Sequence, residues 1–517
     1  MIRHLVTVSF LAASCSIAQA QTVGERIYAE KCASCHGASR MGLSGPALIP
    51  ETLSRLRGDA LTKTILEGRA QTQMPAFSDV LSKDEIAAVA EYINRPLDTV
   101  PTWTEQDIAK SRVMSADYKA PLKPIFTADP LNLFVVVETG DHHISVLDGD
   151  TFDRLDRFAT PFAVHGGPKF SPDGRFVFVM SRDGWVQKYD LWGLQEVGRV
   201  RAGLNARNIA MSKDGKWLAV ANYLPHTLTI LSTEDLTVQK IFDVADAKGT
   251  TSRVSAVYQA PTRDSFILAL KDVPEIWEVA TNPNAEPVFE GFVHSHEKGM
   301  QEALASSSGL FTRRRIPVSQ PLDDFFFDPE YKHLIGAARD GGKAVVVNLI
   351  VGREIAELAL PGMPHLGSGI SWMRDGRRVM ATPHLKEGVI SVIDVESWKL
   401  VSTIKTEGPG FFLRSHETSP YVWADAFFGR DKNAVHIIDK QSLSIVKTLR
   451  PAPGATVAHV EFDRYGRYAL VSVWEDQGAL IVYDAKTLEE IKRIPMRKPS
   501  GKYNVFNKIT FSEGTSH

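Results

Sequence analysis

Three residues near the N-terminus, in the stretch EKCASCHG, have the types and the spacing for covalent chemistry. Cys32 and Cys35 are separated by two residues, and His36 follows directly. Two such thiols alone could form a redox disulfide or half of a zinc site, but the one further cysteine, Cys15, supplies no second pair. The histidine favours a different chemistry, because C-x-x-C-H is the attachment signature of c-type heme. The thiols would bond to the porphyrin edge, and His36 would ligate the iron.

The second axial ligand of such a heme should follow some tens of residues later, where QTQMPAF supplies Met74. A His/Met pair raises the reduction potential and suits electron transfer; the alternative is an ordinary core methionine. GERIYAEKC predicts a helix leading into the motif, and LSKDEIAAVAEYINR predicts another, capped by Ser82 and Glu85. Residues 21–98 therefore look like a small all-α class I cytochrome c domain carrying one heme c.

The first twenty residues, MIRHLVTVSFLAASCSIAQA, read as a secretory signal peptide, with cleavage expected after Ala20. The apolar run is too short to anchor the chain, and no later segment is apolar for about 20 residues, so we expect a periplasmic protein with no transmembrane segment. Cys15 leaves a lipoprotein site open as the alternative. The net charge of −2, without a dense Lys/Arg run, argues against nucleic-acid binding.

The composition and pattern of the sequence change after residue 98. Residues 99–117 read as a linker, and from residue 118 short β-rich runs alternate with turns. Strands such as SVLDGDTF, SVIDVESW and IVYDAKTL repeat every 42 to 46 residues, except across one interval of 116 residues that holds a weak copy near residue 279 and an insertion. Four-stranded units of this period predict that residues 118–517 form an all-β eight-bladed β-propeller, rather than an array of β-sandwiches.

Three histidines of this region stand in similar contexts, each after an apolar or proline run and just before a blade's expected inner strand. They are His165 in FAVHGGP, His365 in GMPHLGSG and His459 in ATVAHVEF. Side chains at these positions would face the central channel, where loops from every blade meet. Glycines around His165 and His365 would let a large flat ligand approach the backbone. The alternative for each histidine is a packing or surface role.

The segments FAVHGGPKFSPDGRFVFVMSRDGWVQKYDLWG, LNARNIA, MPHLGSG, ATPHLKEG and PSGKYNVFN, together with the heme motif, resemble the cytochrome cd1 nitrite reductase family over almost the whole mature chain. The resemblance implies a heme d1-type ligand in the propeller, with His165 as its proximal iron ligand. It also implies that Arg182 and Arg207 pair with its carboxylates, a natural use of the guanidinium group. The alternative is that these arginines only close blades through salt bridges.

One departure from the nitrite reductases concerns proton delivery. Of the two distal histidines that protonate nitrite in that family, one matches His365, whereas the other falls in SQPLDDFFFD, where Asp323 is the nearest equivalent. The nitrite reductases also often have an N-terminal arm that brings a tyrosine to the heme d1 site, whereas here the mature chain is expected to run straight from QTVGERIY into the heme helix. Losing one of the two proton donors should greatly lower the rate of nitrite reduction.

The closer resemblance is to the dihydro-heme d1 dehydrogenases of the same family. These periplasmic enzymes of heme d1 biosynthesis oxidise a propionate side chain of dihydro-heme d1 to an acrylate. The resemblance implies His365 as distal iron ligand, His459 as the base and Tyr503 beside the reacting side chain. Heme c would take the electrons, and His384, His416 and Asp323 would surround the site.

Two other functions stay open from the sequence. One is a nitrite reductase with an altered distal site, and the other is a heme d1 carrier that performs no chemistry. The partners implied are dihydro-heme d1, a periplasmic electron acceptor and a nitrite reductase that receives the product. A carrier would have no use for an electron outlet, so the heme c motif favours the dehydrogenase.

Overall fold

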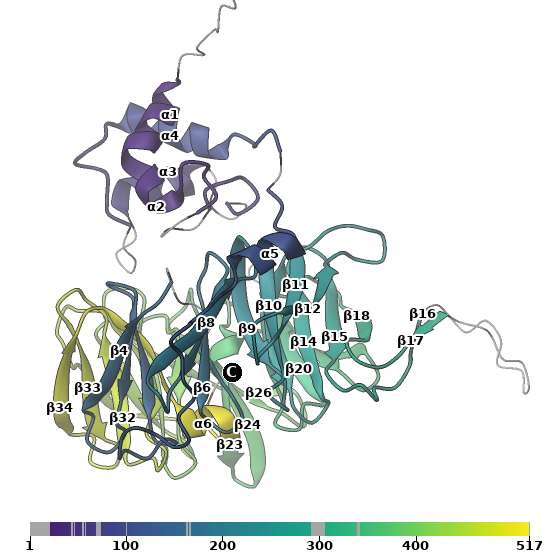
Figure 1. The fold of residues 1–517 in the computed structure, drawn as a ribbon. Helices are drawn as coiled ribbons and strands as arrows, with labels where there is room; N and C mark the ends of the chain where they lie inside the picture. Colours follow the sequence, from purple (N-terminus) through teal and green to yellow (C-terminus); the bar gives the residue numbers. More distant parts are fainter. Residues whose placement is uncertain are drawn as a thin grey trace, which may run out of the picture.

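The structure is a small helical unit set over one face of a large β-propeller (Figure 1). This computed structural model describes residues 21–42, 45, 47–53, 56, 58–68, 74–99, 101–161, 164, 167–290, 305–338 and 342–515. The expected signal peptide and His165 lie outside the described residues. Among the described residues, no helix is long and apolar enough to cross a bilayer.

The helical unit confirms the predicted helices. Helix α1 (Val23–Ile27), a π-helical turn (Tyr28–Cys32) and α2 (Ala33–His36) run on without a break into the heme motif, and α3 (Asp59–Glu67) and α4 (Lys83–Asn94) pack beside them. The predicted capping box of α4 is present, with Glu85 N–H bound to Ser82 Oγ and Ser82 N–H bound to Glu85. Gly24 lets α1 cross α4 closely, because a Cβ there would lie 2.2 Å from the carbonyl oxygen of Ala88.

Eight four-stranded antiparallel blades form the propeller, which confirms the predicted fold. The first four, each given from its inner strand outward, are β35 (Pro499–Asn504), β2 (Phe134–Glu138), β3 (His143–Leu147) and β4 (Arg154–Ala159); β5 (Lys169–Phe170), β6 (Phe176–Met180), β7 (Trp185–Asp190) and β8 (Gln195–Arg201); β9 (Asn205–Met211), β10 (Trp217–Leu224), β11 (Thr227–Ser232) and β12 (Val238–Asp243); and β13 (Val254–Ala260), β14 (Ser265–Leu270), β15 (Glu275–Ala280) and β18 (Arg313–Pro317).

The remaining four blades follow in chain order. They are β19 (Asp324–Phe327), β20 (His333–Ala337), β21 (Lys343–Asn348) and β22 (Arg353–Ala359); β23 (Ile370–Arg374), β24 (Arg377–Pro383), β25 (Val389–Asp394) and β26 (Lys399–Lys405); β27 (Leu413–Arg414), β28 (Tyr421–Asp425), β29 (Val435–Asp439) and β30 (Ile445–Leu449); and β31 (Val457–Phe462), β32 (Tyr468–Val473), β33 (Gly478–Asp484) and β34 (Glu490–Met496). The short helix α6 (Val505–Thr510) ends the described elements.

The repeating strands share an acidic or polar residue near their end, such as Asp394 in SVIDVESW and Asp484 in IVYDAKTL, and the structure explains why it recurs. It ends the third strand of a blade, and its side chain accepts hydrogen bonds from N–H groups of the turn to the fourth strand, as Asp394 does from Ser397 (2.7 Å) and Asp484 from Thr487 (2.7 Å). Such a turn stabilises a tight hairpin locally. Large side chains such as Trp277 and Trp423 then fill the space between neighbouring blades.

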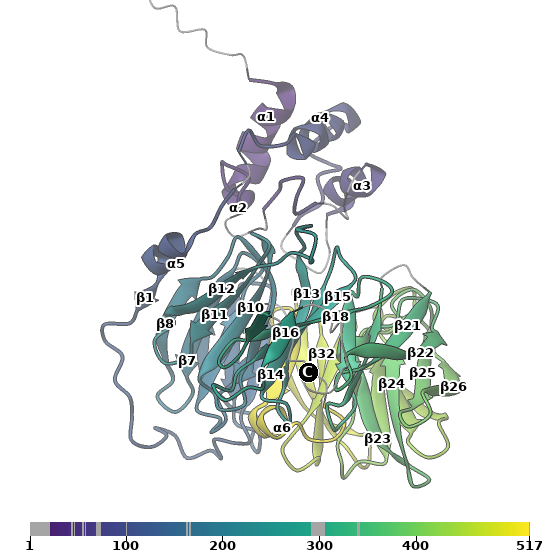
Figure 2. The ribbon, with the colours of Figure 1, turned by 90° about the vertical axis from the view of Figure 1, so that its right-hand side faces the viewer.

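The long interval between repeats holds the predicted weak blade and an insertion. Strand β15 of the fourth blade contains the weak copy near residue 279. A separate two-stranded ribbon of β16 (Val288–Glu290) and β17 (Ala305–Ser307) projects from the propeller in Figure 1, and its strand β16 lies in the foreground of Figure 2. The fourth strand of this blade is β18, which pairs directly with β15 despite the insertion between them in the sequence.

The segment expected to be a linker contains ordered structure. Helix α5 (Glu105–Ser111), capped by Thr104, precedes β1 (Val113–Met114), which adds a fifth strand to the second blade by pairing with β8. Trp103 Nε1 donates to the carbonyl oxygen of Arg201 at 2.8 Å. The segment therefore fastens the helical unit to the propeller.

A buried apolar cluster joins the two units. Ala47 and Ile49 of the helical unit pack with Leu204 and Leu224 of the third blade, and Trp103 covers them. Leu204 lies in the connection from an outer strand to the next inner strand, so the helical unit covers the face where these connections emerge.

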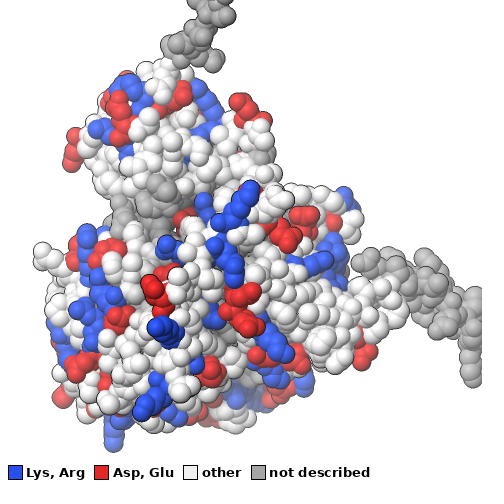
Figure 3. All heavy atoms as spheres, viewed as in Figure 1, with Lys and Arg blue, Asp and Glu red and all other residues white. Residues whose placement is uncertain are grey.

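Charges of both signs are interspersed over the visible surface (Figure 3).

Ring closure depends on the chain's C-terminal part. Strand β35 supplies the inner strand of the first blade by pairing with β2, in a register that sets Tyr503 opposite Val135.

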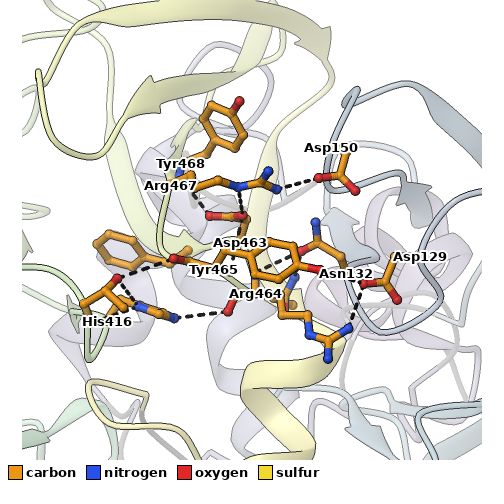
Figure 4. A network of polar contacts seen from close by, with 12 residues as sticks. Asp129, Asn132, Asp150, His416, Asp463, Arg464, Tyr465, Arg467 and Tyr468 are labelled. Atoms are coloured by element: carbon orange, nitrogen blue, oxygen red, sulfur yellow. Dashed lines mark hydrogen bonds and ion pairs between the residues drawn. The ribbon is translucent and has the colours of Figure 1, made fainter.

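Figure 4 shows a polar network that supports the same junction between the eighth and first blades. Arg464 N–H donates to Asn132 Oδ1 (2.9 Å), and its guanidinium donates to Asp129 (2.8 Å). His416, from the seventh blade, reaches the carbonyl oxygen of Arg464 at 3.3 Å.

Asp463 is the buried centre of this network and provides a test of it. Its carboxylate accepts from Tyr468 N–H (2.9 Å) and Arg467 Nε (3.1 Å). Asp463→Ala should lower the free energy of unfolding by about 2–3 kcal/mol, because the N–H of Tyr468 and the guanidinium of Arg467 lose a buried, charged acceptor. Chemical denaturation measures the effect. Asp214→Ala, in the corresponding turn of the third blade, is the control and should cost less than about 1 kcal/mol, since that side chain is 43% exposed. Equal losses in both variants would contradict the role of the junction.

Candidate functional site

The heme motif lies at the end of the first helical run. Cys32 is half-buried, Cys35 is exposed, His36 is buried, and the two thiols are not joined in a disulfide. Tyr28 Oη holds this turn by donating to the carbonyl oxygen of Gly37 at 2.7 Å. A Cβ at Gly45 would lie only 2.7 Å from the His36 ring, so glycine leaves that ring room.

The surroundings of the motif fit a c-type heme. Cys32 and Met74 border one apolar cluster, which includes Leu61, Ile65 and Phe77. Burial, with a smaller effect from Cys35, raises the pKa of the Cys32 thiol to about 11, so it stays protonated at neutral pH. Within the described residues, no group of three or more His, Cys, Asp and Glu side chains could hold a metal ion. Two thiols, an imidazole and a thioether around an apolar cluster suit covalent heme c.

The propeller axis gathers one polar or charged side chain from each blade. Most come from the inner strand itself, and one comes from the turn just before it. In blade order they are Tyr503, Lys169, Arg207, Tyr258, Asp324, His365, Arg414 and His459.

His365 is held in one orientation by the neighbouring blade. Its Nδ1 lies 2.8 Å from the carbonyl oxygen of Phe411, and because a carbonyl only accepts, Nδ1 carries the proton. Nε2 is then the basic nitrogen and lies 3.9 Å from Asp324 Oδ2. Burial lowers the pKa of His365, with Asp324 opposing it. A neutral imidazole whose other nitrogen donates to a carbonyl is the usual form of an iron-ligating histidine.

The predicted arginines lie on neighbouring blades. Arg182, in the turn between β6 and β7, offers its carbonyl oxygen to Ala206 N–H at 3.0 Å, one residue before Arg207. Burial opposes the charge of Arg207, but Tyr223 and Asp324 hold its pKa above the ordinary value. Arg207 therefore stays a cation at the axis. Arg182 is half-buried at the same end of the channel.

His459 occupies a strained position among cations. Its φ is +53°, at a bulge in the pairing of β31 with β32. Its Nε2 is 3.4 Å from Arg414 Nη2, and its ring centroid is 5.3 Å from that of Tyr503. Burial first, then Lys502 and Arg414, lower the pKa of His459 well below the ordinary value. The ring is neutral at physiological pH, the form that a base requires.

Asp425, at the end of β28, connects the two histidines. One carboxylate oxygen accepts from Phe411 N–H (2.7 Å) and Phe412 N–H (3.0 Å), and the other accepts from His459 N–H (3.0 Å). Because the carbonyl oxygen of Phe411 also accepts the hydrogen bond from His365 Nδ1–H, one carboxylate positions the backbone beneath both imidazoles. Burial raises the pKa of Asp425 to about 6, against the N–H bonds that favour its charged form.

Most of the predicted site residues meet at this axis, whereas others have structural partners. His384 Nε2 lies 2.9 Å from Ser391 Oγ, and His416 belongs to the closure network. Asp323 forms an ion pair with Lys271. His165 is outside the described residues, but Gly167, two residues later, faces Tyr503, since a Cβ there would lie 3.3 Å from the tyrosine ring.

Sequence reasoning missed several charged residues of the axis. Asp425, Arg414, Lys169, Lys502 and Lys508 were not among the candidates. A usable signal was present for two of them, because Lys169 and Arg414 each stand beside an apolar residue in a two-residue inner strand. Asp425 carried no such signal, since its role depends on the segment before β27 of its own blade and on strand β31 of the eighth blade.

The comparisons with known proteins agree with this geometry. The family model "Cytochrome D1 heme domain" matches residues 128–290 and 292–508, and "Cytochrome C oxidase, cbb3-type, subunit III" matches residues 19–93. The chain belongs to the cytochrome D1 heme domain family. The predicted membership is thus confirmed, and the second match supports a heme c in the helical unit.

Individual members of the cytochrome D1 heme domain family match over nearly the full length. The chain is 50% identical over 504 residues to "Dihydro-heme d1 dehydrogenase" of Pseudomonas aeruginosa, covering 97% of both chains. It is 26% identical to "Nitrite reductase" of Stutzerimonas stutzeri, covering 95% of this chain and 94% of the other. A solved structure, "Dihydro-heme d1 dehydrogenase NirN in complex with DHE", superposes with a TM-score of 0.82 at 50% identity, covering 94% and 100% of the chains.

The axis of this cytochrome D1 heme domain is built to take a polar ligand. His459 Nδ1 is buried and makes no hydrogen bond with the described residues, whereas Arg414 Nε and Glu461 Oε2 lie 3.8 Å apart as a buried ion pair. Native proteins rarely leave an atom such as His459 Nδ1 unmatched, and exceptions concentrate at functional sites. A tetrapyrrole with carboxylate side chains and a central iron fits the arginines and the Nε2 of His365.

Met74 allows a direct test of the heme c ligand set. Met74→Leu keeps the volume but removes the thioether, so the reduction potential of the heme c-loaded protein should fall. Redox titration measures the potential. Met114→Leu, on β1 outside the helical unit, should leave it unchanged. An unaltered potential in the Met74 variant would show that another residue ligates the iron.

Proposed function

We propose that this chain is a periplasmic dehydrogenase of heme d1 biosynthesis that oxidises a propionate side chain of dihydro-heme d1 to an acrylate. The 50% identity to a dihydro-heme d1 dehydrogenase over nearly the whole chain supports an oxidoreductase of this kind. The observation that carries the proposal is the pair His459 and Tyr503, which places a neutral imidazole beside a phenol at the buried axis.

His459 is the proposed base. Arg414 only donates, and its 3.4 Å contact leaves the lone pair on His459 Nε2 weakly engaged. The lowered pKa keeps this atom unprotonated at neutral pH, so it can take a proton from the substrate side chain. Asp425 fixes the backbone that presents the ring.

Tyr503 is the proposed hydrogen-bond donor to the substrate. Burial raises its pKa to about 12, so its hydroxyl keeps the proton through neutral pH. Its ring lies against Gly167, which leaves room for a close backbone approach at the same point. The hydroxyl can thus orient the reacting side chain beside His459.

The remaining site residues bind the substrate. His365 Nε2 would ligate its iron from one face, and His165 would do so from the other. Arg182 and Arg207 would pair with its carboxylates. Making the carbon–carbon double bond releases two protons and two electrons, and a heme c held by Cys32 and Cys35 would supply a one-electron outlet toward a periplasmic acceptor. The apolar contact between the helical unit and the third blade supports this arrangement.

The direct test uses the heme c-loaded full chain. Dihydro-heme d1 is added without any other enzyme, and the extracted tetrapyrrole is weighed by mass spectrometry. Loss of two hydrogens together with reduction of heme c is the expected result. Binding without a mass change, with an electron acceptor present, would overturn the dehydrogenase. Nitrite turnover by the d1-loaded protein would then indicate a reductase, and release of unchanged tetrapyrrole to a nitrite reductase would indicate a carrier.

His459→Ala should bind dihydro-heme d1 but lower kcat by about 10²–10⁴-fold, the usual contribution of a general base. Binding is followed by the absorbance of the tetrapyrrole, and turnover by mass. The matched control is His333→Ala. His333 is hydrogen-bonded to Asp328 in the fifth blade, and the variant should retain full turnover. Wild-type rates in the His459 variant would remove it from the mechanism.

The pH dependence follows from the same histidine. Since the pKa of His459 lies well below 6.5, the base is unprotonated throughout the range above that value. We expect kcat/KM to stay level as the pH falls from 7.5 to 6.5 and to decline only at lower pH, as Nε2 takes up a proton. A pH–rate profile checks this. An acid limb centred at or above pH 6.5 would contradict the assignment.

A further inference from the structure

One buried carboxylate holds the backbone beneath both imidazoles of the axis. We propose that Asp425 is a positioning residue for the reaction, and that it fixes the spacing between His365, the proposed iron ligand, and His459, the proposed base. This inference rests on the proposed function and deepens it, because it identifies what keeps the base within reach of the reacting side chain when the iron of the substrate is bound at His365.

The first arm of this link leads from Asp425 to His365. Asp425 Oδ1 accepts from the N–H groups of Phe411 and Phe412, at 2.7 Å and 3.0 Å. The carbonyl oxygen of Phe411 accepts from His365 Nδ1 at 2.8 Å, and the centroids of these two rings are 4.3 Å apart. His365 therefore takes its orientation from a backbone segment that the carboxylate holds in place.

That segment, residues 411–412, packs closely against the end of β28. Asp425 N–H donates to the carbonyl oxygen of Phe412 at 3.3 Å, so the segment and the strand are joined in both directions. A Cβ at Gly410 would lie only 2.6 Å from the carbonyl oxygen of Asp425, which shows how near the two backbones come. A shift of the carboxylate is therefore passed on to the His365 ring.

The second arm leads to His459. This histidine stands at the bulge between β31 and β32, and its φ of +53° lies in the left-handed region, which is unfavourable for a residue with a Cβ. Asp425 Oδ2 accepts its N–H at 3.0 Å, and Lys502 Nζ donates to its carbonyl oxygen. Bulges commonly re-aim a side chain at functional sites, and here the side chain is that of the proposed base.

Phe412 joins the two arms. Its N–H belongs to the first arm, whereas its ring centroid lies 4.6 Å from that of His459. The two imidazoles thus share one support, and Asp425, which is 1% exposed, binds the backbone of all its parts. An asparagine would be easier to bury than a carboxylate, but it offers a single acceptor oxygen and would turn an amide donor toward the remaining N–H.

The spacing matters because proton removal depends steeply on geometry. A base works only within about 3 Å of the proton that it takes, and a misplacement of about 1 Å can lower the rate about 10²-fold. A substrate held through its iron presents its side chains at set distances from His365. The rigid link from His365 to His459 therefore decides which carbon atom of the substrate the base can reach.

Asp425→Asn tests the arm to His459. The amide oxygen can keep the N–H groups of residues 411–412, whereas the amide nitrogen would face the N–H of His459 and cannot accept from it. We expect kcat for the loss of two hydrogens from dihydro-heme d1 to fall about 10²-fold while the affinity stays unchanged. Hydrogen exchange, measured on the heme c-loaded protein before substrate is added, should become faster at the His459 amide and stay unchanged at Phe411 and Phe412.

Asp425→Ala releases both arms and is the second variant. Its affinity for dihydro-heme d1 should fall about tenfold as well, and the absorption spectrum of the bound tetrapyrrole should change, because His365 loses its support. The matched control is Asp190→Asn in the second blade. The Asp190 carboxylate is 0% exposed and accepts from Trp192 N–H at 2.9 Å, so this variant should lower the melting temperature but leave kcat, affinity and exchange at His459 unchanged.

The outcomes separate the inference from the function on which it rests. If wild-type protein fails to remove two hydrogens from dihydro-heme d1, the proposed function is wrong. If wild-type protein converts it, but folded Asp425→Asn protein has the wild-type kcat and wild-type exchange at His459, the positioning role is wrong. Equal losses of kcat in the Asp425→Asn and Asp190→Asn variants would also overturn it, because that result would indicate a general loss of stability rather than a lost spacing.

Discussion

The pairing of β35 with β2 is the constraint on which the rest of the structure depends. Eight sheets around an axis form a closed ring only if the last and first blades are joined, and here a strand from the C-terminal end completes the first blade. Closing so long a loop costs little more entropy than closing a shorter one, because the cost grows only logarithmically with length. The ladder hydrogen bonds and the buried network at Asp463 offset that cost.

The same pairing determines the chemistry of the axis. Residues 499–504 reach the centre only through closure, and Tyr503 thereby comes to lie between His459 of the eighth blade and Gly167 of the second. Helix α6 follows at once and brings Lys508 to the same place. The residues nearest to the proposed reaction thus come from segments more than 300 positions apart in the chain.

Two histidines at one axis stand in opposite electrostatic surroundings. His365 faces the carboxylate of Asp324, whereas His459 faces Arg414 and Lys502. Burial lowers the pKa of both, but the carboxylate opposes this effect for His365 and the cations reinforce it for His459. Different surroundings can assign different roles to identical side chains, here the proposed iron ligation by His365 and the proposed proton removal by His459. Asp425 keeps the two rings in a fixed relation through the backbone.

Some features were determined by the sequence alone. The spacing of Cys32, Cys35 and His36, the capping box of α4 and the period of the acidic turn residues are local patterns, because each depends on contacts within a few residues. They were enough to predict both domains and the blade count. The partners of His365 and His459, the position of Asp425 and the grouping of Lys169 with Lys508 were decided only by the tertiary structure. Each of these depends on contacts between segments that lie far apart in the chain. The spacing of residues along the sequence does not show which strands become neighbours when the ring closes.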